Sequence, residues 1–240
     1  MKKLLIFDYD NTLAKPVSVP SDEVLYEITR LLEKNYVAVM SGRTFEPLKR
    51  LFVDKISVLN RDNLKNLFIC PSYGNKIYNW SAERLNLVYE AEVMTQEDKQ
   101  IICEALRALE GTGRGEVKEK EGYIVIDCLG DDVSDEEKEM WDPKGTKRLA
   151  IKKGLDEMLQ GRFETFVAGR ASVDVIAKGG NKADNTVRLA KMLDVPLKDV
   201  VFTGDEFEVY GNDYPLLSLK DIHINIVKNP EETLELMHKV

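Results

Sequence analysis

"LLIFDYDNT", residues 4–12, is the stretch that decides the fold. Its first four residues are apolar without interruption, and the pattern becomes acidic and polar at Asp8. An unbroken apolar run of this length is typical of a parallel strand that helices cover on both faces. We therefore predict a strand at residues 4–7, followed by Asp8, Asp10 and Thr12 at the edge of the sheet where open α/β sheets bind ligands.

The surrounding sequence alternates between helix and strand patterns at both ends of the chain. In the first part we expect a helix at 21–34 with Ser21 as its N-cap, a strand at 36–40, a helix at 46–52, and strands at 56–59 and 67–70. In the last part we expect a helix at 182–193, strands at 200–203 and 222–227, and a closing helix from Pro230. This alternation indicates an α/β fold built around a parallel sheet.

The middle of the chain has a different pattern, in which strands come in pairs. We expect a helix at 97–109, strands at 116–120 and 123–128, a helix at 146–159, and strands at 163–168 and 172–177. Paired strands separated by helices indicate an α+β module. We therefore predict a core made of residues 1–81 and 180–240, with an inserted domain at 82–179.

Composition excludes several classes of function. The 34 basic and 42 acidic residues give a net charge of −8, which disfavours nucleic acid and anionic membranes as partners. The apolar run before Asp8 is too short for a signal peptide, and no window approaches the roughly 18 apolar residues of a membrane span. Cys70, Cys103 and Cys128 form neither a disulfide framework nor a zinc pattern. We expect a cytoplasmic protein that does not bind membranes.

Two carboxylates at the end of the first strand point to a metal ion. Asp8 and Asp10 are two residues apart, and like charges that close are costly unless a cation lies between them. Mg²⁺ prefers a few carboxylate oxygens together with water and a substrate phosphate. We predict Mg²⁺ as the cofactor, with the Asp8 carboxylate, the Asp10 carbonyl and Asp205 as its ligands.

The same residues suggest phosphoryl transfer. Asp8 can attack phosphorus to form an aspartyl-phosphate, while Asp10 protonates the leaving oxygen and then activates water. Hydroxyl and backbone N–H groups at Thr12, Ser41 and Gly42 can bind the phosphoryl oxygens, and Lys182 adds a positive charge. Taken singly, each has an ordinary structural reading as a turn, a helix cap or a surface lysine. Their joint occurrence at strand ends and helix starts favours the functional reading.

These residues resemble the motifs of the haloacid dehalogenase (HAD) superfamily. The first motif, D-x-D-x-T, corresponds to residues 8–12, the second to Ser41-Gly42-Arg43, and the third to Lys182. The fourth motif resembles two segments, Gly204-Asp205 and Gly211-Asn212-Asp213. The resemblance implies that Asn212 and Asp213 support the metal site. The resemblance implies a Rossmannoid core, an aspartate nucleophile, Mg²⁺ and an inserted C2b-type cap that closes over the substrate.

Within that superfamily the chain is most similar to the eukaryotic type of phosphomannomutase and to sugar-phosphate phosphatases. Asn212 follows Asp205 by seven residues as in the mutases, and Ser172 and Asp174 match mutase residues that contact substrate. The mutase cap, however, binds a distal phosphate with arginines, where this chain has Lys120, Asp131 and Lys138. Arg170 is an arginine of the predicted cap that we expect to compensate in part.

Two further differences from the mutase motifs lie in the predicted core. Ser41-Gly42-Arg43 looks more like the second motif of the sugar-phosphate phosphatases than like that of the mutases, and Asn11 stands where glycine is usual.

Three hypotheses remain open at this point. The first is a phosphatase that acts on a small phosphorylated metabolite such as a sugar phosphate, and the second is a phosphomannomutase-like enzyme. The third is a non-enzymatic phospho-acceptor or phosphate-binding protein, for which the predicted leaving-group acid Asp10 would have no use. The predicted partner is a small phosphorylated substrate, and the chain is expected to be a monomer or a homodimer.

Overall fold

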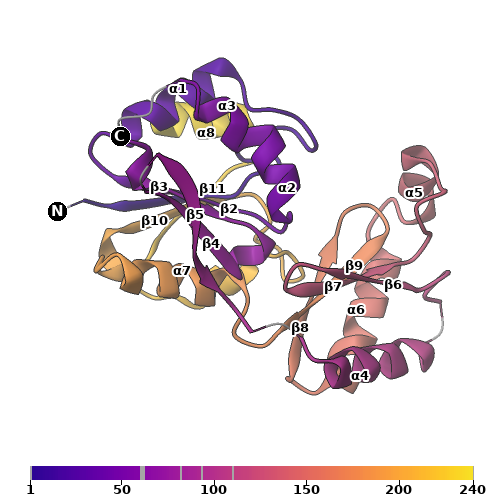
Figure 1. The fold of residues 1–240 in the computed structure, drawn as a ribbon. Coiled ribbons are helices and arrows are strands. Elements are labelled where there is room, and N and C mark those ends of the chain that lie inside the picture. Colours follow the sequence, from indigo (N-terminus) through magenta and orange to yellow (C-terminus); the bar gives the residue numbers. More distant parts are fainter. Residues whose placement is uncertain (1, 60–62, 82, 93, 110, 240) are drawn as a thin grey trace. The chain divides into compact units, whose positions relative to one another are not determined.

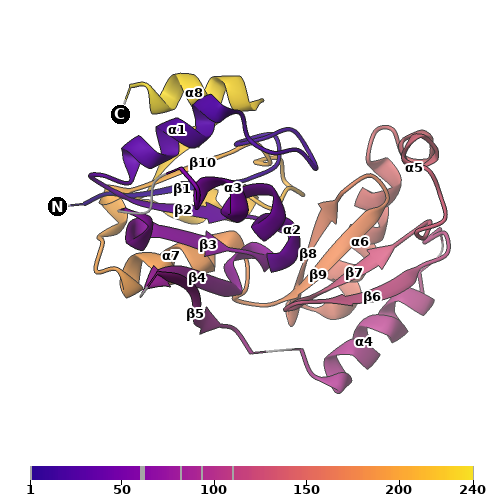
Figure 2. The ribbon, with the colours of Figure 1, turned by 45° about the horizontal axis from the view of Figure 1, so that its top comes forward.

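The structure is a computed structural model that describes residues 2–59, 63–81, 83–92, 94–109 and 111–239. It divides into two compact units (Figures 1 and 2). The core unit consists of Met1–Ala91, Lys182–Phe207 and Asp213–Val240, and the cap unit of Glu92–Asn181 and Glu208–Asn212. The predicted fold class, a parallel α/β core with an inserted α+β module, is confirmed.

The core unit is built on a sheet with the strand order β11-β10-β1-β2-β3-β4-β5. Its parallel strands are β1 (Leu4–Phe7), β2 (Tyr36–Met40), β3 (Leu67–Cys70), β10 (Val200–Gly204) and β11 (His223–Ile226). Two antiparallel strands, β4 (Lys76–Ser81) and β5 (Arg84–Glu90), extend it at one edge. Phe7 lies opposite Val39 of β2 and Thr203 of β10, so the carboxyl ends of the three central strands meet.

Helices cover both faces of this sheet. One face carries α1 (Asp22–Leu31), α2 (Phe45–Leu48), α3 (Asp54–Ile56) and α8 (Pro230–Met237), with a π-helical turn, η1 (Lys49–Val53), between α2 and α3. The other face carries α7 (Lys182–Met192). The core unit also contains four short 3-10 turns, η2 (Leu64–Asn66), η3 (Ser72–Gly74), η4 (Leu197–Asp199) and η5 (Tyr214–Ser218). Leu5 and Phe7 pack into the first layer, and Leu4 and Ile6 into the second. This double coverage explains the unbroken apolar run of β1.

The strand predicted at residues 56–59 is wrong. The helical segment that begins at Phe45 continues through Ile56, which is buried, whereas Val58 and Leu59 are 73% and 53% exposed. A run of four mostly apolar residues does not distinguish a strand from the last turn of a helix.

The hairpin of β4 and β5 was not predicted. Because β5 pairs with β4, the first division between the units falls after Ala91 rather than after residue 81, and the second falls after Asn181.

The cap unit contains an antiparallel sheet with the order β6-β7-β9-β8. Its strands are β6 (Glu116–Lys120), β7 (Tyr123–Asp127), β8 (Phe163–Ala168) and β9 (Ser172–Ala177), all of which were predicted, and its helices are α4 (Gln96–Arg107), α5 (Asp135–Trp141) and α6 (Thr146–Leu159). Apolar residues of α4 and α6 pack on one face of the sheet. Across the residues described in either unit, no helix is long and apolar enough to cross a bilayer.

Candidate active site

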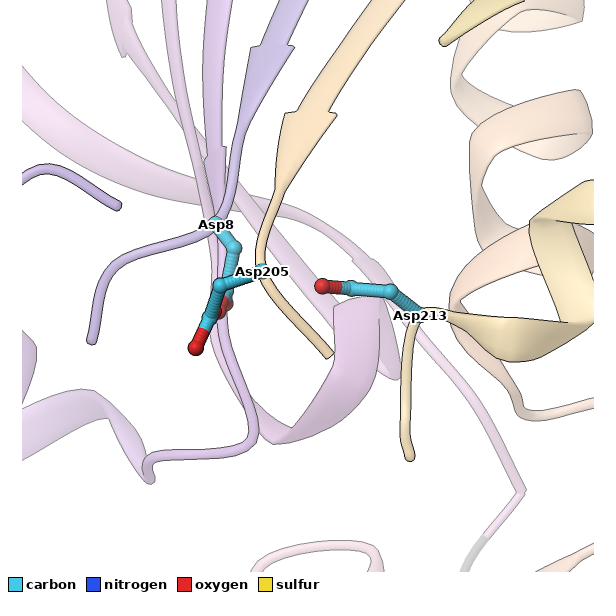
Figure 3. Close-up of side chains that lie close together, drawn as sticks. All are labelled: Asp8, Asp205 and Asp213. Atoms are coloured by element: carbon cyan, nitrogen blue, oxygen red, sulfur yellow. The ribbon is translucent and has the colours of Figure 1, made fainter. Parts of the chain in front are cut away.

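Three aspartates converge at the carboxyl ends of β1 and β10. Asp8 directly follows β1 and Asp205 directly follows β10, and these strands are neighbours in the sheet. Asp213 comes from the loop before η5, and its side chain points toward the other two (Figure 3). Carboxylate oxygens of the three residues lie within 4.8 Å of one another. The sheet register thus brings together two of the predicted metal ligands and one predicted supporting residue.

Lys182 lies in the middle of this cluster. It is the first residue of α7, its side chain is completely buried, and its Nζ lies 2.8 Å from Asp8 Oδ1 and 2.7 Å from Asp213 Oδ1. Burial alone would lower the pKa of the ammonium group, but the charges of Asp213 and Asp8 outweigh it and the pKa is raised. Lys182 is therefore a permanent positive charge in contact with the predicted nucleophile.

The cluster has more negative than positive charge. The three carboxylates and one ammonium sum to −2 when all are ionised. Burial raises the pKa of Asp8 well above its usual range; Lys182 opposes this shift, and the charges of Asp213 and Asp205 add to it. The pKa of Asp205 is also raised, by burial and then by Asp213. A divalent cation would compensate this charge, and Mg²⁺ favours such oxygen ligands.

The carboxylate of Asp213 is hydrogen-bonded to groups of the protein itself. Its carboxylate is fully buried and accepts from Lys182 Nζ and, at 3.1 Å, from the Glu206 N–H. A side chain at Gly204 would collide with Asp213 Oδ2, so glycine at this position permits the close approach. Asp213 thus holds Lys182 and the Glu206 backbone, while the cluster of Asp8, Asp205 and Asp213 as a whole could hold a metal.

Arg43 forms a bidentate ion pair with the side chain of Asp10. Its Nε and Nη2 donate to the two carboxylate oxygens of Asp10, each at 2.7 Å, in a fork geometry that fixes the orientation of the carboxylate. Burial would lower the pKa of Arg43, but the hydrogen bond to Asp10 and the charge of Asp10 outweigh it, so the pKa is raised. Arg43 was not among the predicted site residues. The available signal was its place as the third residue of the Ser41-Gly42-Arg43 segment.

The Ser41–Arg43 loop is held rigidly beside the aspartates. Ser41 is buried, its N–H donates to the Cys70 carbonyl at 3.1 Å, and its carbonyl accepts from the Tyr73 N–H at 2.8 Å. A side chain at Gly42 would come within 3.0 Å of the Tyr73 ring, so only glycine fits without displacement. Thr12 is also buried, and its Oγ1 donates to Asp205 Oδ1 at 3.3 Å.

Asn212, which was predicted to support the fourth motif, belongs to the short segment assigned to the cap unit. Its Oδ1 is buried and has no hydrogen-bond partner among the described residues.

The predicted cap residues lie in three different places. Lys120, Ser172 and Asp174 lie on the sheet face opposite the one covered by α4 and α6, as the cross-strand register requires. Lys138 lies on α5, and Arg170 is exposed in the turn between β8 and β9.

Comparison with known proteins agrees with this geometry. Residues 134–239 match a family of haloacid dehalogenase-like hydrolases. "Phosphomannomutase 2" of Dictyostelium discoideum is 24% identical over 98% of this chain and 95% of its own length, and a phosphomannomutase of Babesia bovis is 24% identical over 92% and 91%.

Among solved structures, an IMP-nucleotidase of Plasmodium falciparum superposes with a TM-score of 0.76 at 21% identity, covering 99% of this chain and 69% of its own. A sucrose-phosphatase of Synechocystis in complex with sucrose and phosphate gives a TM-score of 0.59 at 19% identity, with coverages of 100% and 87%. At these identities the two structures show the fold alone.

Proposed function

This chain belongs to the haloacid dehalogenase-like hydrolase superfamily, as the resemblance of its motifs predicted, and we propose that it is a Mg²⁺-dependent phosphatase. Its substrate would be a small phosphorylated metabolite, with sugar phosphates as the first class to test. The observation that carries the proposal is the cluster of three carboxylates and one lysine at the carboxyl ends of β1 and β10, which has a charge of −2 when all four groups are ionised. Such a site favours a divalent cation, which together with Lys182 would bind a phosphoryl group.

The contacts of Asp8 fit the task of a nucleophile. Lys182 binds Oδ1 of Asp8, which leaves Oδ2 as the attacking oxygen. Attack on phosphorus forms an aspartyl-phosphate and releases the leaving group, and water then hydrolyses this intermediate and regenerates Asp8. Mg²⁺, when bound, supplies charge stabilisation for the transferring group, and Lys182 adds to it from the protein side.

Asp10 is the acid and base of the proposed reaction, and Arg43 holds its carboxylate. Asp10 gives a proton to the departing oxygen and afterwards removes one from the attacking water. Arg43 does not take part in proton transfer, since its guanidinium stays protonated, but it fixes the direction in which the Asp10 oxygens point. Ser41 Oγ and the backbone N–H groups at Thr12 and Gly42 are the proposed partners of the phosphoryl oxygens, because the Thr12 hydroxyl donates to Asp205.

Contacts within the cap unit favour a phosphatase over a mutase. A mutase must hold a second phosphate, and Asp131, which stands where the mutases have an arginine, instead pairs with Lys118 at 2.8 Å. Lys118 also pairs with Asp127 at 2.7 Å, so its charge is already compensated. Lys120 and Lys138 provide point charges without the fork of a guanidinium. The full-length similarity to phosphomannomutases keeps a sugar-phosphate mutase as the second candidate.

A phosphate-release screen separates the candidates. Purified protein is incubated with Mg²⁺ and a panel of sugar phosphates and nucleoside monophosphates, with the Asp8→Asn variant as the control. We expect release of inorganic phosphate from at least one substrate and a loss of at least about 10³-fold in the variant, which retains the shape of the side chain but not the nucleophile.

Three results would contradict the proposal. Interconversion of mannose 1-phosphate and mannose 6-phosphate that depends on a sugar bisphosphate, without net hydrolysis, would favour the mutase. Stable labelling at Asp8 by acetyl phosphate without turnover would favour a phospho-acceptor. Full activity of the Asp8→Asn variant would remove Asp8 from the mechanism.

A further inference from the structure

Asn11 makes a contact that glycine, the residue usual at this place in the first motif, cannot make. It lies in the tight turn that follows β1, where the N–H groups of Leu13 and Ala14 both donate to the Tyr9 carbonyl. Its backbone φ is 54°, in the left-handed region. Glycine adopts this conformation without strain, and asparagine is among the few residues with a side chain that tolerate it. The backbone therefore permits either residue, and any effect specific to Asn11 must come from its side chain.

The side chain of Asn11 is directed at a proposed metal ligand from the other end of the sequence. Its Nδ2 donates to Asp205 Oδ2 at 3.2 Å, across 194 positions of the chain. Thr12 Oγ1 donates to the other oxygen, Oδ1, at 3.3 Å. The two neighbouring residues of the first motif thus hold the carboxylate of Asp205 by both of its oxygens.

A neutral donor is suited to this position. Asp205 shares its site with Asp8 and Asp213, and without a fixed partner its carboxylate would rotate away from those two like charges. A lysine or arginine could hold Asp205 as well, but its positive charge would oppose the binding of a cation. An amide fixes the direction of the oxygens without adding charge, which is how partners of metal-binding carboxylates commonly raise affinity.

We propose that Asn11 is a positioning residue that orients the Asp205 carboxylate and thereby increases the affinity of the site for Mg²⁺. This inference rests on the proposed function, because it takes Asp205 as a ligand of the metal. In this proposal Asn11 acts through Asp205, to which its side chain donates. The expected consequence is a change in metal affinity with little change in the chemical step.

The test is the Asn11→Gly variant, which removes the amide and relieves any strain at the left-handed φ. Mg²⁺ binding to the metal-free protein is measured by titration calorimetry without substrate, and we expect the Kd to rise about 10-fold. At saturating Mg²⁺ we expect kcat and the substrate KM to remain within about 3-fold of the wild type, since an outer partner of a metal ligand acts mainly on metal affinity. The matched control is Asp194→Gly, at an exposed position with a φ of 53°, which should leave the Kd unchanged.

The possible failures are distinguishable. If the wild type binds Mg²⁺ and Asn11→Gly binds it equally well, the inference is overturned while the proposed function stands. A fall in kcat at saturating Mg²⁺ with an unchanged Kd would likewise overturn it, since Asn11 would then act on the reaction itself. If the wild type binds no Mg²⁺ at all, the metal-dependent phosphatase fails and the inference fails with it.

Discussion

Each unit of the molecule contains a lysine held between two aspartates in nearly the same geometry. In the core unit, Lys182 Nζ lies 2.8 Å from Asp8 and 2.7 Å from Asp213. In the cap unit, Lys118 Nζ lies 2.7 Å from Asp127 and 2.8 Å from Asp131. The distances alone would not tell which cluster is a site of chemistry.

The clusters differ in their access to water. The side chains of Lys182 and Asp213 are 0% exposed and that of Asp8 is 7% exposed. In the cap unit, Asp127 is 12% exposed, but Lys118 is 22% exposed and Asp131 is 88% exposed. Water screens the exposed charge of the cap cluster at Asp131, whereas the core cluster, with Asp205 added, has more carboxylates than ammonium groups, and a bound cation would balance them. The burial of the whole ion pair, rather than ion pairing itself, therefore marks the candidate active site.

Matched substitutions of the two lysines test this comparison directly. Lys182→Met leaves buried carboxylates without their cation, and we expect it to lower the free energy of unfolding of the metal-free protein by about 3–5 kcal/mol. Lys118→Met removes a partly exposed pair, and we expect a loss of about 1 kcal/mol or less. Urea unfolding in the presence of a chelator measures both. Equal losses for the two variants would show that burial does not separate the clusters.

The fork between Arg43 and Asp10 gives a smaller but more specific test within the core unit. Arg43→Lys keeps the positive charge but cannot hold both oxygens of Asp10, so we expect kcat to fall about 10- to 100-fold, a part of the roughly 10²- to 10⁴-fold that a positioned acid–base group contributes. The Mg²⁺ Kd should stay unchanged. Arg30→Lys, which alters a pair with Glu27 elsewhere in the same unit, is the control and should retain kcat. An unchanged kcat in Arg43→Lys would mean that Asp10 needs no such orientation.

The parts of the site that follow strand ends could be predicted from the sequence. Asp8 and Asp205 come directly after apolar runs, and the carboxyl ends of parallel strands meet at one edge of a sheet. The pairings among the side chains could not be predicted. That Asp213 holds Lys182 and that Arg43 holds Asp10 depends on how separate loops pack, and no local periodicity encodes it. The same holds for Asn11, whose departure from glycine was visible but whose partner, Asp205, lies 194 positions away.

The β4–β5 hairpin was missed for a related reason. Side chains of β5 are largely half-buried or exposed, so the strand lacks the clear apolar pattern that made β1 easy to recognise. The extent of the sheet at its edge is fixed by pairing with β4 rather than by the composition of β5 itself.

A buried carboxylate in the cap unit extends the comparison to pH. Asp142 is 3% exposed, and it accepts from the N–H groups of Lys147 and Arg148, each at 3.0 Å, and from Arg148 Nε at 3.0 Å. Burial would raise its pKa, but these donors outweigh burial and the pKa is lowered. Unlike Asp8, whose pKa is raised, Asp142 has its charge compensated by the protein, so its charge should stabilise the fold.

This stabilisation has a definite pH dependence. Because the folded-state pKa of Asp142 lies below the unfolded value of about 3.9, its contribution is present in full above that value and is lost as the pH falls through the folded-state pKa. We expect Asp142→Asn to lower the free energy of unfolding by about 1.5 kcal/mol at pH 7, with a difference from the wild type that shrinks at strongly acidic pH. Urea unfolding from pH 7 down to about pH 2.5 measures the difference in the free energy of unfolding between the variant and the wild type. The control is Asp132→Asn, at an exposed position of the same unit. A deficit that stays constant over the whole range would show that Asp142 stabilises the cap unit by shape rather than by charge.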